Sequence, residues 1–258
     1  MRTAYSVETV RAAERELMAR LPEGALMQRA AAGLAAACAD LLGRVYGRRV
    51  VLLVGSGDNG GDALYAGARL ARRGAGVTAV LLAPERAHSA GLATLRRAGG
   101  RAVGVEAAEV VIRHADLLLD GIVGIGGKGG LRPDAARLAA VADSARCAVV
   151  AVDLPSGVDA DTGEVRGAAV RADLTVTFGT HKPGLLVDPA REYAGSVRLV
   201  DIGLRAVLPA EAELEALQHA DVRRLLPVPS GESDKYRRGV VGIAAGSARS
   251  PGAAVLAV

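Results

Sequence analysis

The chain has 258 residues, half of them hydrophobic, and its 32 basic and 28 acidic residues give a formal net charge of +4. The charges are interspersed and no basic stripe is interleaved with aromatic residues, so nucleic-acid binding is not expected. Because Trp is absent and Phe178 is the one Phe, the core must consist of Ala, Val, Leu and Ile. This composition suits a parallel sheet of Val- and Leu-rich strands covered by Ala-rich helices.

No membrane or secretory segment is expected from the sequence. Residues 1–16 lack the apolar stretch of a signal peptide, and the most apolar helical segment, 25–43, is interrupted by charged residues. The two cysteines, Cys38 and Cys147, have no metal-binding spacing, so buried free thiols are expected. The sequence therefore predicts a cytoplasmic protein.

Apolar runs alternate with helical periodicity along most of the chain. The strand candidates are residues 49–54, 77–82, 101–105, 116–119, 147–152, 173–178 and 196–201. The helix candidates are residues 6–20, 25–43, 61–73, 89–98 and 132–145. This alternation predicts the α/β class, specifically a three-layer α/β/α Rossmann-like sandwich with a mostly parallel sheet.

The pattern changes after Leu204. Residues 207–226 have helical character, and a polar linker rich in Pro, Gly and Ser follows them. Residues 239–258 then show a strand pattern, a glycine-rich turn and the start of a helix, a unit that cannot bury its own faces. We therefore expect one domain over residues 1–212 and, over 213–258, a linker and the opening of a second domain.

Three predicted strands end in loops rich in glycine and polar residues. The loops are GSGDNGGD at 55–62, DGIVGIGGKGG at 120–130 and DLPSG at 153–157. In open parallel sheets ligands bind outside the carboxyl ends of the strands. A single aspartate at a strand end is as often a helix cap or a turn residue as it is a functional residue. The first loop is only a weak dinucleotide fingerprint. Three such loops on one edge favour a binding site.

The polar residues of these loops favour a hard cation. Asn59, Asp120 and Ser156 offer oxygen ligands, which suit an alkali or alkaline-earth ion rather than zinc. Such an ion would allow an anionic substrate to approach, and the glycine-rich backbone could bind its phosphates at helix N-termini. Lys182 follows the sixth predicted strand and should reach the same edge, unless it is a solvated loop lysine.

Four ordered segments carry a family resemblance. They are GSGDNGGDALYAGARL, LLLDGIVGIGGKG, VVAVDLPSGVDADTGEV and LTVTFGTHKPGL, and the early segments VRAAERE and ALMQRAAAGLA agree with them. Over about residues 6–204 the chain resembles the YjeF N-terminal domain family, the NAD(P)H-hydrate epimerases. The resemblance implies a Rossmann-like enzyme, typically with a potassium ion, that interconverts the R and S epimers at C6 of the hydrated cofactors NADHX and NADPHX.

The resemblance also implies roles for individual residues. The potassium ligands would be Asn59, Asp120 and Ser156. Substrate contacts would come from Asp58, Asn59, Gly60, Gly61 and Asp62, from Gly124, Ile125, Gly126, Gly127, Lys128, Gly129 and Gly130, and from Asp153. Asp153 and Lys182 are the candidate catalytic residues, Asp153 as an acid or base and Lys182 tuning it or donating a proton. The family often forms homodimers.

Two positions depart from the family pattern. Asp58 stands where an asparagine is usual and places negative charge beside the phosphates, and Ala63 stands where a glycine is usual.

The C-terminal segment carries a second resemblance. Its sequence, SDKYRRGVVGIAAGSARSPGAAVLA, resembles the start of the ribokinase-like dehydratase domain, which uses ADP or ATP and is fused to the epimerase in many bacteria. The catalytic region of that domain would lie beyond residue 258, so dehydratase activity is not expected of this chain.

Two other functions remain open from the sequence. Relatives of this fold serve as non-catalytic scaffolds, but the retention of Asp120, Asp153, Ser156 and Lys182 favours an enzyme. An NAD-dependent oxidoreductase would need an acid at the second strand end to bind the ribose, and Glu85 follows a proline there.

Overall fold

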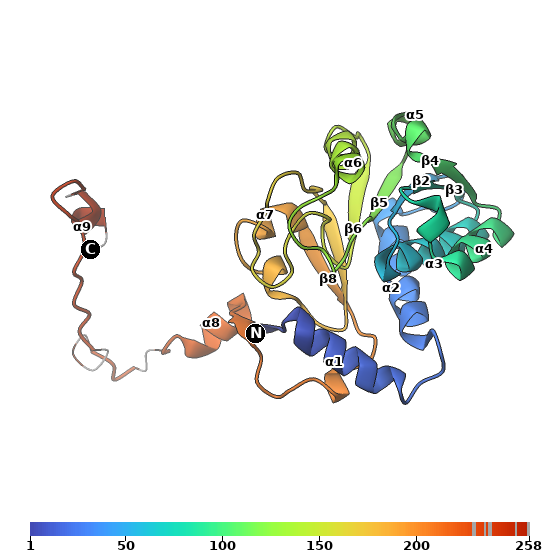
Figure 1. The fold of residues 1–258 in the computed structure, drawn as a ribbon. Helices are drawn as coiled ribbons and strands as arrows, with labels where there is room; N and C mark the ends of the chain where they lie inside the picture. The colour runs from blue at the N-terminus through green and yellow to red at the C-terminus, as the bar shows by residue number, and fades with distance from the viewer. Residues whose placement is uncertain (229–230, 235, 237–238, 251, 257–258) are drawn as a thin grey trace. The chain divides into compact units, whose positions relative to one another are not determined.

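The computed structural model describes residues 1–228, 231–234, 236, 239–250 and 252–256. It divides into two compact units, Met1–Ala216 and Leu217–Val258. The first unit contains the main sheet and every residue that the sequence places in the site (Figure 1).

A seven-stranded parallel sheet forms the centre of the first unit. Its strand order is β4-β3-β2-β5-β6-β7-β8, and every neighbouring pair is parallel. The strands are β2 (Arg49–Val54), β3 (Gly76–Leu81), β4 (Arg101–Gly104), β5 (Leu117–Gly121), β6 (Ala148–Val152), β7 (Leu174–Phe178) and β8 (Ser196–Val200). The chain runs outward from β2 to β4 and then returns to place β5 beside β2. This reversal is the switch point at which such sheets bind ligands.

Helices cover both faces of this sheet, as the Rossmann-like prediction requires. On one face, α2 (Ala25–Leu42), α3 (Asp58–Arg72) and α4 (Ser89–Arg97) bury Leu34, Leu64 and Leu95 against Leu52. On the other, α5 (Ala108–Arg113) and α6 (Pro133–Asp143) pack against Leu53, the next residue of β2. Successive strand residues thus enter opposite cores, which is why the strands are continuous apolar runs. The predicted three-layer α/β/α sandwich is confirmed.

Helix α2 is long and apolar enough to cross a membrane by length and composition alone. Eight of its residues are buried, and they belong to the core that also contains β2 and α3. At Gly33 an added Cβ would lie 2.3 Å from a methyl group of Val200 on β8, so α2 packs directly on the sheet.

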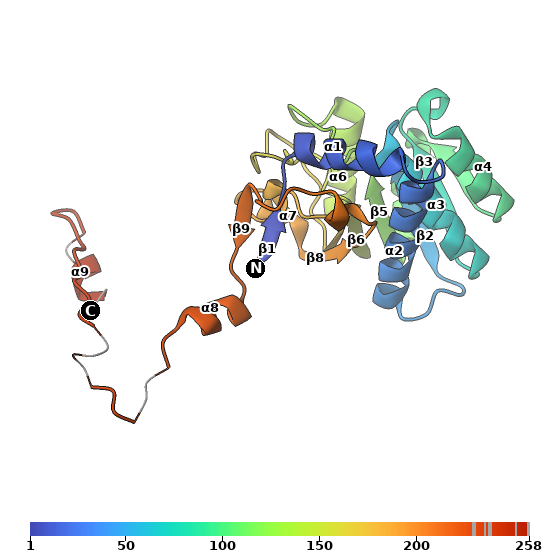
Figure 2. The same ribbon diagram turned by 90° about the horizontal axis from the view of Figure 1, so that it is seen from below.

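The N-terminal segment lies along the carboxyl edge of the sheet. Strand β1 (Arg2–Ala4) pairs antiparallel with β9 (Leu214–Ala216), and Ser6 caps the helix α1 (Val7–Met18) that follows (Figure 2). The Tyr5 N–H donates to the carbonyl of His181 at 3.0 Å, and the Val7 N–H donates to Asp161 Oδ1 at 2.7 Å. Both acceptors are in loops that follow strands of the main sheet, so α1 is fixed beside those loops.

The remaining elements of the first unit are short. They are the 3₁₀ turns η1 (Pro84–Arg86), η2 (Val105–Ala107), η3 (Pro183–Leu185) and η4 (Leu204–Ala206), and the helix α7 (Arg191–Ala194). In the second unit, α8 (His219–Leu225) and α9 (Gly252–Leu256) are the helices among the described residues.

Three sequence predictions about secondary structure were wrong in detail. The helical pattern predicted over 207–226 is instead β9 followed by α8, because Leu214–Ala216 pairs with β1 and contacts between distant residues override local propensity. The strand pattern after Gly239 forms no strand within the described residues 239–250. Helix α3 begins at Asp58 rather than at residue 61, which places residues 58–62 of the first glycine-rich motif inside a helix.

Candidate active site

Asp153 and Lys182 form a buried ion pair beyond β6 and β7. Lys182 is 1% exposed, and its three N–H groups donate to Asp153 Oδ1 at 2.5 Å, to Thr177 Oγ1 at 3.1 Å and to the Phe178 carbonyl at 3.1 Å. Asp153 Oδ1 also accepts from the Thr177 hydroxyl at 3.0 Å and the Phe178 N–H at 3.2 Å. Since all three lysine donors are used, Lys182 is placed to hold Asp153, and Asp153 Oδ2 has no hydrogen bond among the described residues.

The backbone at Asp153 is strained. Its φ is 65°, and it is the one non-glycine residue with positive φ in the part of the chain that the structure describes. The Leu154 N–H donates to the Val152 carbonyl at 2.8 Å, which closes a γ-turn around Asp153. Gly179, with φ of 71°, has the same arrangement after β7, where glycine is unstrained. A non-glycine residue in such a conformation costs about 1–3 kcal/mol, and such strain is concentrated at functional sites.

Asp120 and Ser156 join the second and third predicted loops. Asp120 is the fourth residue of β5 and is fully buried. Its Oδ1 accepts from the Ser156 hydroxyl at 2.6 Å and the Ile122 N–H at 3.3 Å, and its Oδ2 accepts from the Ser156 N–H at 2.7 Å. Ser156 Oγ accepts from the Val123 N–H at 3.0 Å and lies 3.1 Å from the Val123 carbonyl oxygen. Burial raises the pKa of Asp120 to about 6, and the hydrogen bonds from Ser156 and Ile122 oppose that rise.

The first predicted loop meets this group through Asn59. The side chain of Asn59 is buried, and its Nδ2 has no hydrogen-bond partner among the described residues. A Cβ added at Gly124 would lie 2.8 Å from Asn59 Oδ1, and one added at Gly55 would lie 1.8 Å from the Ile122 carbonyl oxygen. Glycine is therefore required at both positions for the loops to approach. Asn59, Asp120, Val123 and Ser156 are the Asp120 cluster.

Two further carboxyl groups surround the ion pair. Asp62, in the second turn of α3, is 8% exposed, and no hydrogen bond reaches its Oδ1 in the part of the chain that the structure describes. Glu14 lies half-buried on α1, near enough for the charges of Lys182 and Asp153 to affect its pKa, which burial raises. Glu14, Asp62, Asp153 and Lys182 are the Lys182 cluster.

The sequence analysis did not identify Glu14. Its segment, VRAAERE, indicated only a helix, and the helix reaches the site because β1 pairs with β9 and Tyr5 bonds to His181. These contacts join residues about 200 positions apart, so no local pattern could have placed Glu14 in the site.

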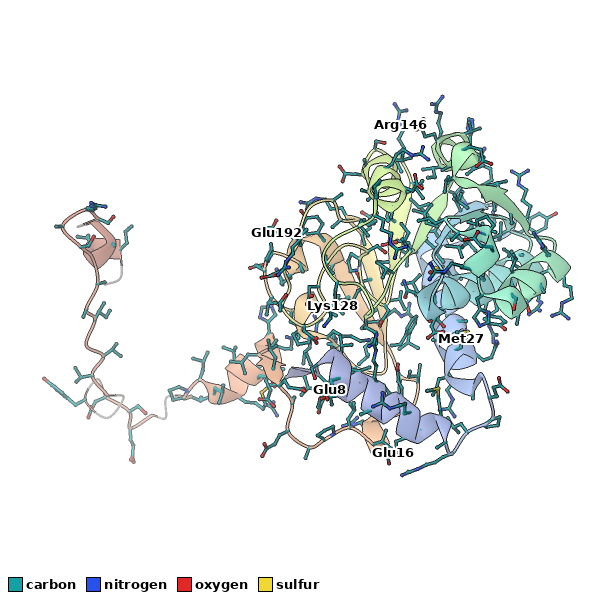
Figure 3. The ribbon with its side chains drawn as sticks, viewed as in Figure 1. Glu8, Glu16, Met27, Lys128, Arg146 and Glu192 are labelled. Atoms are coloured by element: carbon teal, nitrogen blue, oxygen red, sulfur yellow. The ribbon has the colours of Figure 1, made fainter. Side chains whose placement is uncertain are left out.

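The remaining predicted residues lie around the two clusters. Asp58 is exposed at the first position of α3, whereas Gly60 and Gly61 are buried. At Gly61 an added Cβ would lie 3.0 Å from Cε of Met27, which Figure 3 labels on α2. At Gly60 it would lie 2.4 Å from the Gly55 carbonyl oxygen. The glycines thus allow the N-terminus of α3 to pack closely against its neighbours.

The loop after β5 lines a cavity of about 190 Å³. Residues Gly127, Lys128, Gly129 and Gly130 form one wall of this cavity, and residues 157–166 contribute the other. Lys128, labelled in Figure 3, is close enough to Asp159 to lower the pKa of that carboxyl, although hydrogen bonds contribute more. Gly124 contacts Asn59 as described, Ile125 packs on the core, and Gly126 faces Arg11 of α1. Of the predicted substrate residues, Gly127 to Gly130 therefore line this cavity, whereas residues 58–62 and Asp153 do not.

Comparison with known proteins identifies the family. The model of the YjeF-related protein N-terminus matches residues 23–184. The chain belongs to this family. It is 51% identical over 261 residues to the bifunctional NAD(P)H-hydrate repair enzyme Nnr of Mycobacterium tuberculosis, an alignment covering 99% of this chain and 52% of that enzyme. It is 40% identical over 241 residues to the NAD(P)H-hydrate epimerase of Microbacterium testaceum, with 91% of each chain covered.

The chain thus spans about half the length of the bifunctional relatives it matches, and nearly all of the epimerase from Microbacterium. Among solved structures, the yeast protein ynu0 has a TM-score of 0.62 at 18% identity, covering 76% of this chain and 86% of that one. This similarity confirms the Rossmann-like fold of the family member described here.

Proposed function

We propose that this protein is an NAD(P)H-hydrate epimerase, which interconverts the R and S epimers of NADHX and NADPHX at C6. One observation carries the proposal: a family match over residues 23–184 coincides with a strained, buried Asp153–Lys182 pair at the carboxyl edge of the sheet. A scaffold would have no use for the strain at Asp153 or for a lysine buried to 1% exposure.

The substrate would lie across the switch point between β2 and β5. The N-terminus of α3 presents the backbone N–H groups of Asp58 and Asn59, where helices bind phosphate groups, whereas those of Gly60 and Gly61 donate to the Gly57 carbonyl. The loop 124–130 and its cavity would receive the rest of the dinucleotide.

Epimerisation requires the C6–O bond to break as the ring nitrogen forms an iminium ion. A C6–O bond then forms again on the other face of the ring. The carboxylate of Asp153 would stabilise that cation, and its free Oδ2 would exchange a proton with water.

The Asp120 cluster fits a potassium ion. It supplies oxygen atoms from Asp120 and the Val123 carbonyl, each within hydrogen-bond distance of Ser156 Oγ, and Asn59 has an amide atom without a partner among the described residues. Rotating the Asn59 amide by 180° exchanges its Oδ1 and Nδ2 atoms. The side-chain oxygen would then lie where Nδ2 lies now, at the position without a hydrogen bond among the described residues, and the shape of the side chain would not change. Asn59, Asp120 and Ser156 would hold the ion, whose charge would offset the buried carboxylate and the substrate phosphates.

We also infer that the second unit, from Leu217 onward, is the linker and the start of a dehydratase domain. The alignment with the bifunctional enzyme extends over 99% of this chain and so includes these residues. The complete protein would then repair both epimers, in the cytoplasm.

A coupled assay tests the epimerase function. The purified chain is mixed with R and S NADPHX, a separate S-specific dehydratase and ATP, and NADPH is measured. An epimerase yields NADPH from the whole mixture, whereas the dehydratase without this chain stops at the S fraction. Recovery that stops at the S fraction in both reactions would overturn the proposal and favour a module that binds nucleotide without turnover.

A further inference from the structure

Asp62 is a buried carboxyl group without a partner. It is 8% exposed, and no hydrogen bond or ion pair reaches it within the described residues. Buried carboxylates are normally paired, and the two other aspartates of the site follow that rule. Asp120 accepts three hydrogen bonds, and Asp153 accepts three on one oxygen alone. Asp62 is therefore the one of the three that receives no hydrogen bond from the described residues to stabilise its ionised form.

The surroundings of Asp62 favour its protonated form. Helix α3 packs against β5 and β6, and Asp62 lies close enough to Asp153 and Lys182 for their charges to affect its pKa. Burial, followed by the charges of Asp153, Asp58 and Glu14, raises the pKa of Asp62 well above the usual range, and Lys182 opposes that rise. A helix dipole stabilises anions most in the first turn of the helix. Asp62 is the fifth residue of α3 and lies beyond that turn, so the dipole stabilises its carboxylate less.

Two carboxyl groups in one site with contrasting environments commonly divide acid and base roles. We propose that Asp62 is the general acid of the epimerisation and that Asp153 is its partner base. The inference rests on the proposed function, and it assigns the proton donor of that same site.

The proposed step is balanced in protons and electrons. Asp62 gives its proton to the C6 hydroxyl oxygen, the C6–O electron pair leaves with that oxygen as water, and the ring-nitrogen lone pair forms the iminium double bond. A second water adds to C6 on the opposite face, the iminium electrons return to nitrogen, and Asp153 takes the proton that this water releases. Proton exchange with solvent restores the starting state, and the reverse reaction uses the two groups in exchanged roles.

The variant Asp62→Asn tests the assignment because it removes the proton and keeps the shape. We expect kcat to fall by about 10²–10⁴-fold with KM changed less than threefold. The melting temperature should not fall, because a neutral amide replaces a carboxyl group that makes no hydrogen bond in the described structure. Asp143→Asn, which changes an exposed aspartate at the end of α6, is the matched control and should leave kcat unchanged.

A second variant tests the protonation of Asp62 without altering Asp62. Donation requires the protonated form, so kcat should fall as pH rises through the pKa of Asp62. Glu14→Gln removes a negative charge that raises this pKa, and the fall should then occur at lower pH. Glu16→Gln, on the exposed side of α1, should leave the profile unchanged. His88 also packs at this turn of α3 and is unchanged in both variants.

The outcomes separate this inference from the function it rests on. If the wild-type protein fails to epimerise NADPHX, the proposed function is wrong. If the wild-type protein is active but Asp62→Asn keeps its kcat within threefold, only the role of Asp62 is overturned. An unshifted pH profile in Glu14→Gln would likewise overturn the role of Asp62 as the proton donor.

Discussion

The two clusters at the carboxyl edge differ in how completely their carboxylate oxygens are hydrogen-bonded. In the Asp120 cluster the carboxylate accepts three hydrogen bonds, two of them from Ser156, and both of its oxygens are used. In the Lys182 cluster, Asp153 has one oxygen with three donors and the other with none, and Asp62 has no hydrogen bond, among the residues that the structure describes. A satisfied network holds loops in place, whereas unsatisfied oxygens are available to a substrate. This difference agrees with the proposed roles, in which the first cluster holds its loops around an ion and the second moves protons.

The largest expected effect is at Asp153 in the Lys182 cluster. Asp153→Asn should lower the epimerisation rate by about 10²–10⁴-fold, since it removes both the carboxylate that faces the iminium ion and a proton acceptor. It should also destabilise the fold by about 3 kcal/mol, because Lys182 stays buried without its counter-charge. Urea unfolding and the coupled assay measure the two effects.

A double variant distinguishes these two effects of Asp153→Asn. Asp153→Asn with Lys182→Met should regain most of the stability, because no buried charge is left unpaired, while remaining inactive. Recovery of activity in the double variant would show that the carboxylate of Asp153 acts on folding and not on the reaction.

A single methyl group at Gly55 should disrupt the close packing between the loops of the Asp120 cluster. Gly55→Ala places a Cβ 1.8 Å from the Ile122 carbonyl oxygen, so the backbone must move, at a cost of about 1–3 kcal/mol or more. Gly57→Ala is the matched control, because nothing lies within 4 Å of its Cβ and its φ is −104°. It should cost up to about 1 kcal/mol through weaker helix capping. Equal melting temperatures for the two variants would contradict the close packing described for these loops.

Ser156 tests whether the satisfied cluster binds potassium. Ser156→Ala removes a donor to Asp120 and the acceptor of the Val123 N–H, which should cost about 1–3 kcal/mol. The wild-type rate should be higher in potassium than in sodium at equal ionic strength, and this difference should disappear in the variant. Ser144→Ala, an exposed serine at the end of α6, should keep the potassium effect. Equal wild-type rates in the two salts would argue against a potassium site.

The sequence predicted most of the sheet and the three loops that form the Asp120 cluster, for a physical reason. Parallel strands buried on both faces are continuous apolar runs, and their carboxyl ends meet at one edge, so Asp120 and Asp153 could be placed from chain order alone. Lys182 was expected at the same edge for the same reason. The positions of Glu14 and β9 depend instead on contacts between the two ends of the first unit, which local periodicity cannot show.

The smallest expected effect is that of removing β9, which pairs with β1 at the other end of the first unit. Two truncated chains test it. A chain that stops at Ala216 keeps β9 and should retain the stability and activity of the full chain, since the first unit is Met1–Ala216. A chain that stops at residue 212 loses β9, as well as Glu213, whose carboxylate accepts from Ser6 and Thr9 at 2.8 and 2.7 Å. Helix α1 then loses an anchor beside the Lys182 cluster.

The shorter chain should therefore lose about 1–2 kcal/mol of unfolding free energy, by loss of these hydrogen bonds. Its kcat should fall, while the ratio of its rates in potassium and in sodium should change less. The reason is that α1 carries Glu14 of the Lys182 cluster and no residue of the Asp120 cluster. Thermal unfolding and rates in potassium and sodium for the two truncated chains check this. An equal loss of both properties would mean that the two clusters form one cooperative unit, and that the division between ion binding and proton transfer does not hold.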